Sequence, residues 1–190
     1  MVSEKGTRIA HGLMFGLLII VSIVCLAVSG SLVHYYNDHG YPRFHDTAYK
    51  QRIRILLVAS VWTTVFARAS LFCILPHMHT HPSVYPPVVL TVGFHTIGSH
   101  IAFGLLAHLV PIVIGFILFL IGVASLTALT DKVDCGINAG NFARCDVVKG
   151  LVVVSWIETI FLLITLVFLI ILALKARGGY GVHKSTLYNV

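Results

Sequence analysis

The sequence predicts an all-α membrane protein whose fold is a bundle of four transmembrane helices. Hydrophobic residues make up 57% of the 190 residues and charged residues only 11%, against roughly 25% charged residues in a typical soluble domain. A helix needs about 20 consecutive apolar residues to cross a bilayer core, and several stretches of the chain reach that length. Polar stretches with turn-forming residues separate them. Together these observations predict an integral membrane protein.

The first expected span covers residues 9–33, behind a polar tail of residues 1–8. Its basic start and apolar centre resemble those of a secretory signal peptide, but the apolar part of a signal peptide is only about 7–15 residues long. We therefore expect this segment to be retained as a membrane helix. A polar loop over residues 34–54 follows, with Asn, Asp, Gly and Pro as turn signals, and the second expected span covers residues 55–75.

The third expected span is an extended helix. A Pro-rich segment precedes it, and residues 88–130 then carry no Asp, Glu, Lys or Arg, which is roughly twice the length that one crossing requires. Only Pro111 interrupts the apolar centre, so we expect one long helix that crosses the membrane over residues 106–129. Residues 88–105 would lie at or beyond the interface, and a re-entrant segment is the alternative.

The fourth expected span covers residues 151–174, which completes a transmembrane domain over residues 9–176 with a polar tail at 177–190. Four spans place both tails on one side of the membrane. Lys and Arg counts give five on that side and seven in the loops of the other side, a small difference that favours external termini by the positive-inside rule.

Two cysteines, Cys135 and Cys145, argue for the opposite orientation. They flank one Gly-rich turn, and closing a loop of about 11 residues stabilises a fold by roughly 3 kcal/mol in the chain-entropy model. Disulfides are rare in the cytosol. We expect a disulfide in an external loop, and hence cytosolic termini, with two free thiols as the alternative. The charge difference carries less weight because several basic loop residues have acidic neighbours.

Three segments carry a resemblance to a known family. They are YKQRIRILLVASVWTTVFA at the second span, IGVASLTALTDKVDC at the end of the third, and CDVVKGLVVVSWIETIFLLITLVFLI in the fourth. With the four-helix plan, the chain resembles the MARVEL-domain tetraspans, particularly the fungal membrane-associating proteins, over about residues 8–176. The resemblance implies cytosolic termini, a cysteine pair in the last external loop, and a protein that organises membrane in the plasma membrane or in secretory or endosomal vesicles.

Arg68 and Glu158 are the two formal charges that lie well inside the expected spans. An ionisable group at membrane depth costs at least about 2.5–3.5 kcal/mol and is a functional-site hypothesis by default. With a rise of 1.5 Å per residue, their expected depths differ by roughly 9 Å. A polar relay is one interpretation. The favoured one is that Arg68 extends toward the cytosolic interface, while Glu158 bonds to neighbouring helices or stays protonated.

Histidines and glycines are the other candidate site residues. His100 and His108 are expected near the cytosolic side as intramembrane polar groups with an interfacial, pH-sensitive role. Haem or metal binding by imidazoles is an alternative, but the sequence has no Cys-x-x-Cys-His motif, and we expect no cofactor and no metal. Gly12 and Gly16 have the small-xxx-small spacing that lets helices approach closely, either within the bundle or between protomers.

These features predict a non-enzymatic protein that organises or shapes membrane by lateral self-association and lipid contact. No nucleophile, base and acid can be assembled in one aqueous layer, and the net charge of +6 includes no basic block typical of nucleic-acid binding. The expected partners are membrane lipids, with sterol or anionic lipid as candidates, and further copies of the chain. The alternatives are a small channel or transporter subunit that uses Arg68 and Glu158, and a haem- or metal-binding redox protein.

Overall fold

The computed structural model describes residues 4–41, 46–74, 101–131, 133, 135 and 143–178. Nearly all of them belong to four α-helices, and no strand occurs among them. The helices are α1 (Glu4–His39), α2 (Asp46–Ile74), α4 (Ile101–Thr130) and α5 (Cys145–Gly178). Each helix contains a segment long and apolar enough to cross a membrane. The predicted all-α, four-span fold is therefore confirmed.

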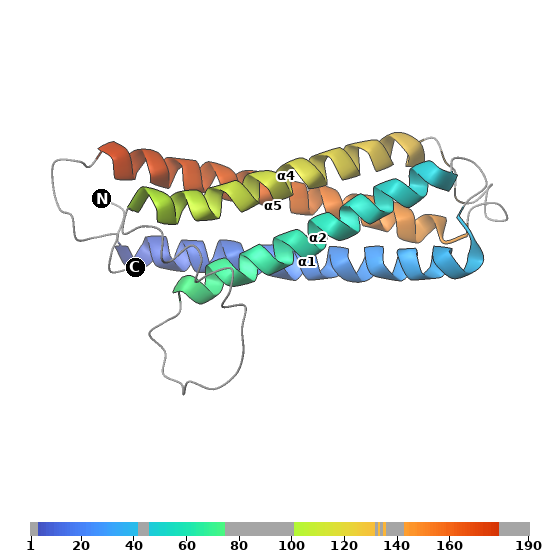
Figure 1. Cartoon of the computed structure of the whole chain (residues 1–190), viewed down its shortest axis with the longest axis horizontal. Coiled ribbons are helices and arrows are strands. Elements are labelled where there is room, and N and C mark those ends of the chain that lie inside the picture. Colours follow the sequence, from blue (N-terminus) through green and yellow to red (C-terminus); the bar gives the residue numbers. More distant parts are fainter. Residues whose placement is uncertain are drawn as a thin grey trace, which may run out of the picture.

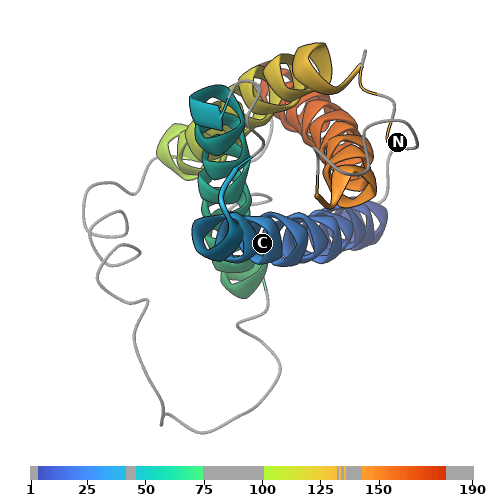
Figure 2. The ribbon, with the colours of Figure 1, turned by 90° about the vertical axis from the view of Figure 1, so that its right-hand side faces the viewer.

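The four helices form an elongated antiparallel bundle (Figure 1). α1 packs against α2 and α5, and α4 packs against α2 and α5, so the helices follow each other around a ring, which Figure 2 shows from one end. α1 begins and α5 ends at the same end of the bundle, which we call the terminal end. α1 ends and α5 begins at the opposite end, which we call the disulfide end.

The helices extend further than the apolar spans that predicted them. The prediction of a polar loop over residues 34–54 is wrong, because α1 continues to His39 and α2 already begins at Asp46. α1 stops where Gly40 adopts a φ of 83° and its N–H donates to the carbonyl of Tyr36 at 3.0 Å, a left-handed glycine C-cap. Polar residues thus mark where a helix leaves the apolar layer, whereas backbone geometry decides where it ends.

The long third helix is confirmed across the membrane segment. α4 runs without a break from Ile101 to Thr130 and includes Pro111 in its interior. The indole N–H of Trp62 on α2 donates to the carbonyl oxygen of Pro111 at 3.0 Å, so α2 and α4 are joined at this point. Residues 88–100 lie outside the described residues, and the choice between an interfacial and a re-entrant segment stays open there.

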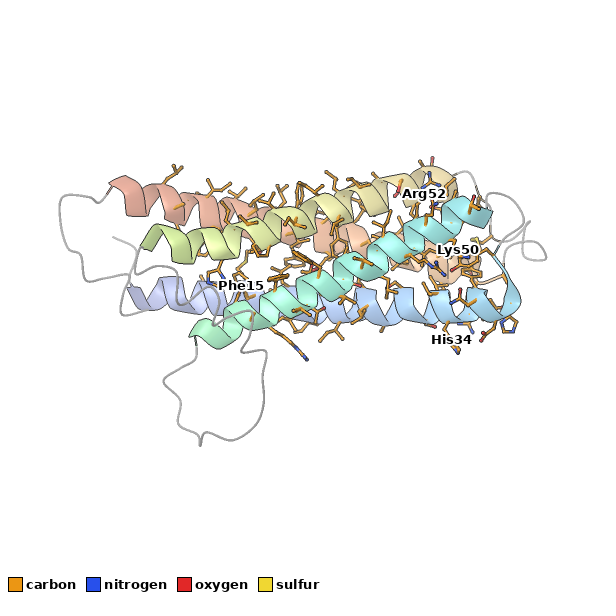
Figure 3. All side chains as sticks on the ribbon, viewed as in Figure 1. Phe15, His34, Lys50 and Arg52 are labelled. Atoms are coloured by element: carbon orange, nitrogen blue, oxygen red, sulfur yellow. A yellow bond between two sulfur atoms is a disulfide. The ribbon has the colours of Figure 1, made fainter. Side chains whose placement is uncertain are left out.

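The bundle is apolar both in its core and on its surface. The core holds large side chains from all four helices, such as Leu32, Ile53, Phe119 and Leu151. The outer faces also carry many exposed Val, Ile and Leu side chains, which a soluble bundle would replace by polar residues. Charged side chains such as Lys50 and Arg52 lie at the disulfide end (Figure 3). An apolar belt with charges at its end is the surface expected of a protein in lipid.

Candidate functional site

Glu158 lies at the contact between α5 and α1, where its side chain is completely buried, with 0% of its surface exposed. The hydroxyl of Ser22 on α1 donates a hydrogen bond to Glu158 Oε1. The other oxygen, Oε2, is buried and has no hydrogen-bond partner in the described structure. The favoured interpretation, that Glu158 bonds to a neighbouring helix, agrees with this geometry.

Glu158 belongs to a short polar contact between two membrane helices. One turn away, Cys25 Sγ of α1 lies 3.7 Å from Ser155 Oγ of α5. Ser22 and Cys25 are three residues apart on α1, as are Ser155 and Glu158 on α5, so each pair occupies one face of its helix. We call these four residues the α1–α5 polar seam. In lipid, polar side chains of two helices form a hydrogen bond only where they face each other. Such bonds therefore favour one pairing of the helices.

Arg68 is separated from this seam. Its side chain is exposed on α2, and it forms no ion pair with any residue that the structure describes. The two intramembrane charges therefore do not meet, as their different expected depths had indicated. An exposed arginine on a membrane helix can place its guanidinium at the headgroup level by extending its aliphatic stem.

Of the two candidate histidines, the structure describes the surroundings of one. His108 on α4 has its Nδ1 atom 2.9 Å from the hydroxyl oxygen of Ser70 on α2, a hydrogen bond between neighbouring helices. His100 lies outside the described residues. Among those that are described, no group of three or more His, Cys, Asp or Glu side chains could hold a metal ion.

The disulfide end is held by a covalent bond and several polar contacts. Cys135 and Cys145 form a disulfide with their Cα atoms 5.6 Å apart, as predicted. The Tyr36 hydroxyl on α1 donates to the carbonyl of Ala143 at 2.7 Å, and the Arg144 guanidinium stacks 4.1 Å from the centre of the Tyr35 ring. The start of α5 is therefore fastened both to the end of α4 and to the end of α1.

Two tyrosines of the expected loop, Tyr36 and Tyr49, are buried and bond to neighbouring segments of the chain. Tyr36 is only 2% exposed and Tyr49 only 3%. Tyr49 on α2 donates to the carbonyl of Leu129 on α4 at 3.0 Å. Both side chains are buried because α1 and α2 extend beyond the expected spans and enclose them between neighbouring helices. Their phenol groups then satisfy backbone carbonyls near helix ends.

The four glycines with helix-packing potential divide into two pairs. A Cβ atom at Gly12 or Gly16 would have no described atom within 4 Å outside its own helix, whereas at Gly115 it would lie 3.1 Å from Thr63 Oγ1. At Gly122 the distance to Leu56 Cδ2 would be only 2.8 Å. Gly115 and Gly122, two turns apart on α4, thus permit close approach of α2. Within the described chain, Gly12 and Gly16 make no such contact.

We expect Gly122→Leu to lower the free energy of unfolding by about 1–3 kcal/mol, the usual penalty for overpacking. The added side chain would meet Leu56 and Ile55 across the α2–α4 contact. Reversible unfolding in lipid or mild detergent measures the change. Gly16→Leu is the matched control, since it adds the same side chain to a membrane helix at a position with open space. Equal stability loss in both variants would contradict the role of Gly122.

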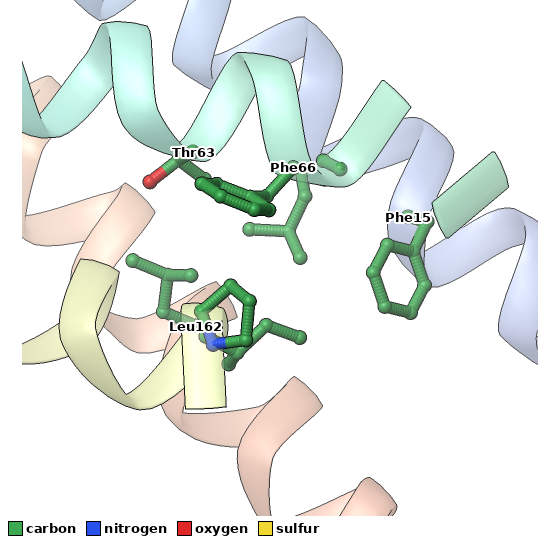
Figure 4. Close-up of a pocket in the computed structure, with 8 residues that line it drawn as sticks. Phe15, Thr63, Phe66 and Leu162 are labelled. Carbon is green, nitrogen blue, oxygen red and sulfur yellow. The ribbon is translucent and has the colours of Figure 1, made fainter. Parts of the chain in front are cut away.

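A cavity inside the bundle is too small for a solute. It measures about 10 Å³, room for about one water molecule. Its lining is apolar apart from Thr63, whose hydroxyl has no hydrogen-bond partner among the described residues, and Phe15, Phe66 and Leu162 close around it (Figure 4). One water bonded to Thr63 would satisfy this hydroxyl. Glu158 does not belong to the lining of this cavity.

No family model, no curated protein and no solved structure matches this chain. The geometry of the four helices is therefore the basis for inferring its function. That geometry offers three features beyond the core: the α1–α5 polar seam, the fastened disulfide end, and the open glycine face of α1.

Proposed function

We propose that the chain is a non-enzymatic tetraspan of the MARVEL type that organises or shapes membrane by lateral self-association and lipid contact. The plasma membrane or secretory and endosomal vesicles are its proposed location, with the termini in the cytosol. The single observation that carries the proposal is the open face of α1. This face combines two glycines, at which an added Cβ atom would meet no described atom within 4 Å, with large apolar side chains directed outward.

The open face has the composition of a helix-packing surface. Gly12 and Gly16 are joined there by Leu13, Leu17 and Ile20, which are 64%, 44% and 61% exposed. Positions four residues apart lie above one another on a helix, so the glycines form a shallow stripe beside a row of apolar side chains. Small residues let two membrane helices come close enough for extensive van der Waals contact. A second protomer is the proposed occupant of this stripe.

We expect the double substitution Gly12→Leu and Gly16→Leu to weaken self-association by about tenfold or more, equivalent to about 1.4 kcal/mol. The leucines would keep the partner helix at a distance. We expect the fold to remain intact, because a Cβ atom at either position meets no atom of the described residues within 4 Å. Energy transfer between labelled protomers in vesicles, measured over a range of protein-to-lipid ratios, gives the dissociation constant.

Gly150→Leu serves as the control, since Gly150 also faces open space but lies on α5 at the disulfide end. Its self-association should equal that of the unaltered chain. A chain that is monomeric at every ratio and leaves vesicle shape unchanged would contradict the proposed function. Flux of ions or solutes through reconstituted protein, abolished by Glu158→Gln, would instead support the channel alternative.

A further inference from the structure

A second pocket opens at the disulfide end between the end of α4 and the first turns of α5. It has a volume of about 240 Å³ and is lined by Thr127, Thr130, Asp131, Lys149, Val152 and Val153. This is smaller than the pockets that enclose drug-sized ligands, which measure about 300–1,000 Å³. It is suited to one compact polar group that remains attached to something outside the pocket.

The polar lining combines opposite charges. The Asp131 carboxylate and the Lys149 ammonium group both border the pocket, and both residues are exposed. Neither forms an ion pair with another residue of the described chain. An acid and a base that face the same space without pairing are complementary to a ligand that carries both a negative and a positive charge.

The pocket lies at one end of the candidate membrane spans of α4 and α5, where lipid head groups are expected. Asp131 directly follows the last residue of α4, and Lys149 lies just before the apolar stretch of α5 that begins at Leu151. Both charges therefore mark the boundary between the apolar layer and water. Basic residues at this boundary attract lipid phosphates.

An apolar track continues from the pocket toward the membrane centre. Val153, which is 58% exposed, borders the pocket, and Trp156 lies partly exposed beyond it on α5. Trp156 is seven residues past Lys149, which places it about 10 Å deeper along the helix. Its indole N–H donates to Thr127 Oγ1, an atom of a pocket residue, at 3.1 Å. An acyl chain attached to a head group in the pocket would pass this ring.

We propose that this pocket binds the head group of a phospholipid that carries both a phosphate and an ammonium group, taken from the leaflet at the disulfide end. Lys149 binds the phosphate, Asp131 binds the ammonium group, and the acyl chain follows Val153 toward Trp156. This inference rests on the proposed function, since it identifies a class of lipid within the lipid contact proposed above. Lys149 alone would accept any phospholipid, so Asp131 determines the choice of head group.

Tryptophan quenching by brominated acyl chains tests the proposal. The full chain is reconstituted into vesicles that contain brominated phosphatidylethanolamine, phosphatidylcholine or phosphatidylglycerol with identical chains. Phosphatidylethanolamine and phosphatidylcholine, whose head groups carry an ammonium group, are expected to bind about two- to fivefold more strongly than phosphatidylglycerol, the range that one exposed ion pair provides. The difference should shrink in high salt, and it should vanish in Trp156→Phe, which removes the reporter.

Two substitutions separate the roles of the charges. Asp131→Asn should abolish the preference for lipids with an ammonium group and leave phosphatidylglycerol equal or favoured. Lys149→Gln should weaken the quenching by all three lipids. Asp146→Asn is the matched control, because Asp146 is an exposed acid in the first turn of α5 that does not line the pocket. Its quenching by the three lipids should equal that of the unaltered chain.

Equal quenching by the three lipids in the unaltered chain would overturn the inference, as would a preference for lipids with an ammonium group that survives Asp131→Asn. The proposed function is tested separately, because Asp131 lies just past the end of α4 at the disulfide end, whereas Gly12 and Gly16 lie near the start of α1 at the terminal end. Self-association without a head-group preference would contradict only the proposed lipid site. A head-group preference in a strictly monomeric protein would contradict only the proposed self-association.

Discussion

Replacement of both Cys135 and Cys145 by serine is expected to lower the free energy of unfolding by about 3 kcal/mol. The disulfide closes a short loop between α4 and α5, so its loss gives the unfolded chain the freedom that the bond removed. The polar contacts of this end, Tyr36 with Ala143 and Arg144 with Tyr35, remain. The bundle should therefore still fold, with a less stable start of α5.

Reversible unfolding in lipid, with and without reductant, measures the effect. Reductant should destabilise the unaltered chain by the same amount and leave the double serine variant unchanged. Tyr36→Phe provides a comparison at the same end: it removes one hydrogen bond, which contributes about 0.5–1.5 kcal/mol, and its effect should not depend on reductant. Alkylation of both thiols in unreduced protein would contradict the prediction and remove the main argument for an external loop.

The spans of this protein could be predicted because a single physical requirement determines them. Each apolar stretch must be long enough to cross the bilayer, and that length is visible in the sequence without knowledge of any neighbour. The Cys135–Cys145 pairing was predictable for a similar reason, since both partners flank one short turn. These two features, each determined by one local stretch of chain, were therefore predicted correctly.

Features that depend on how the helices rotate against each other were not predictable. Gly12 and Gly16 have the spacing of a packing motif, yet the close helix contact forms at Gly115 and Gly122. Glycine is frequent in membrane helices, and its spacing does not show which neighbour a face meets. The hydrogen bonds of Tyr36 and Tyr49 to neighbouring segments were not predicted, because the polar sequence around these residues was interpreted as a loop.

The hydrogen-bond partner of Glu158 could not be predicted for the same reason. Its burial was a reasonable expectation, because a charge in lipid must face the interior of the bundle. Ser22 is one of several serines in the apolar run of α1, and the sequence does not show which of them faces α5. A signal was nevertheless present, since Ser22 and Cys25 on one helix repeat the three-residue spacing of Ser155 and Glu158 on the other.

The largest effect is expected at Glu158 itself. Substitution by lysine should lower the free energy of unfolding by about 3 kcal/mol or more, the penalty for a lysine near the centre of a membrane helix. The ammonium group would face Ser22 in a fully buried position, and the described structure places no acid beside it to compensate the charge. Unfolding in lipid and protease sensitivity of the reconstituted protein both measure the loss.

Glu158→Gln is the matched control, since it keeps the shape and an oxygen that can accept the Ser22 hydrogen bond while removing the ionisable group. We expect its free energy of unfolding to lie within about 1 kcal/mol of that of the unaltered chain, the contribution of one hydrogen bond in a membrane interior. A double-mutant cycle with Ser22→Ala isolates the coupling across the seam. A coupling near zero would mean that the α1–α5 contact is maintained by apolar packing alone. A glutamine variant as unstable as the lysine variant would show that the ionised carboxylate itself stabilises the bundle.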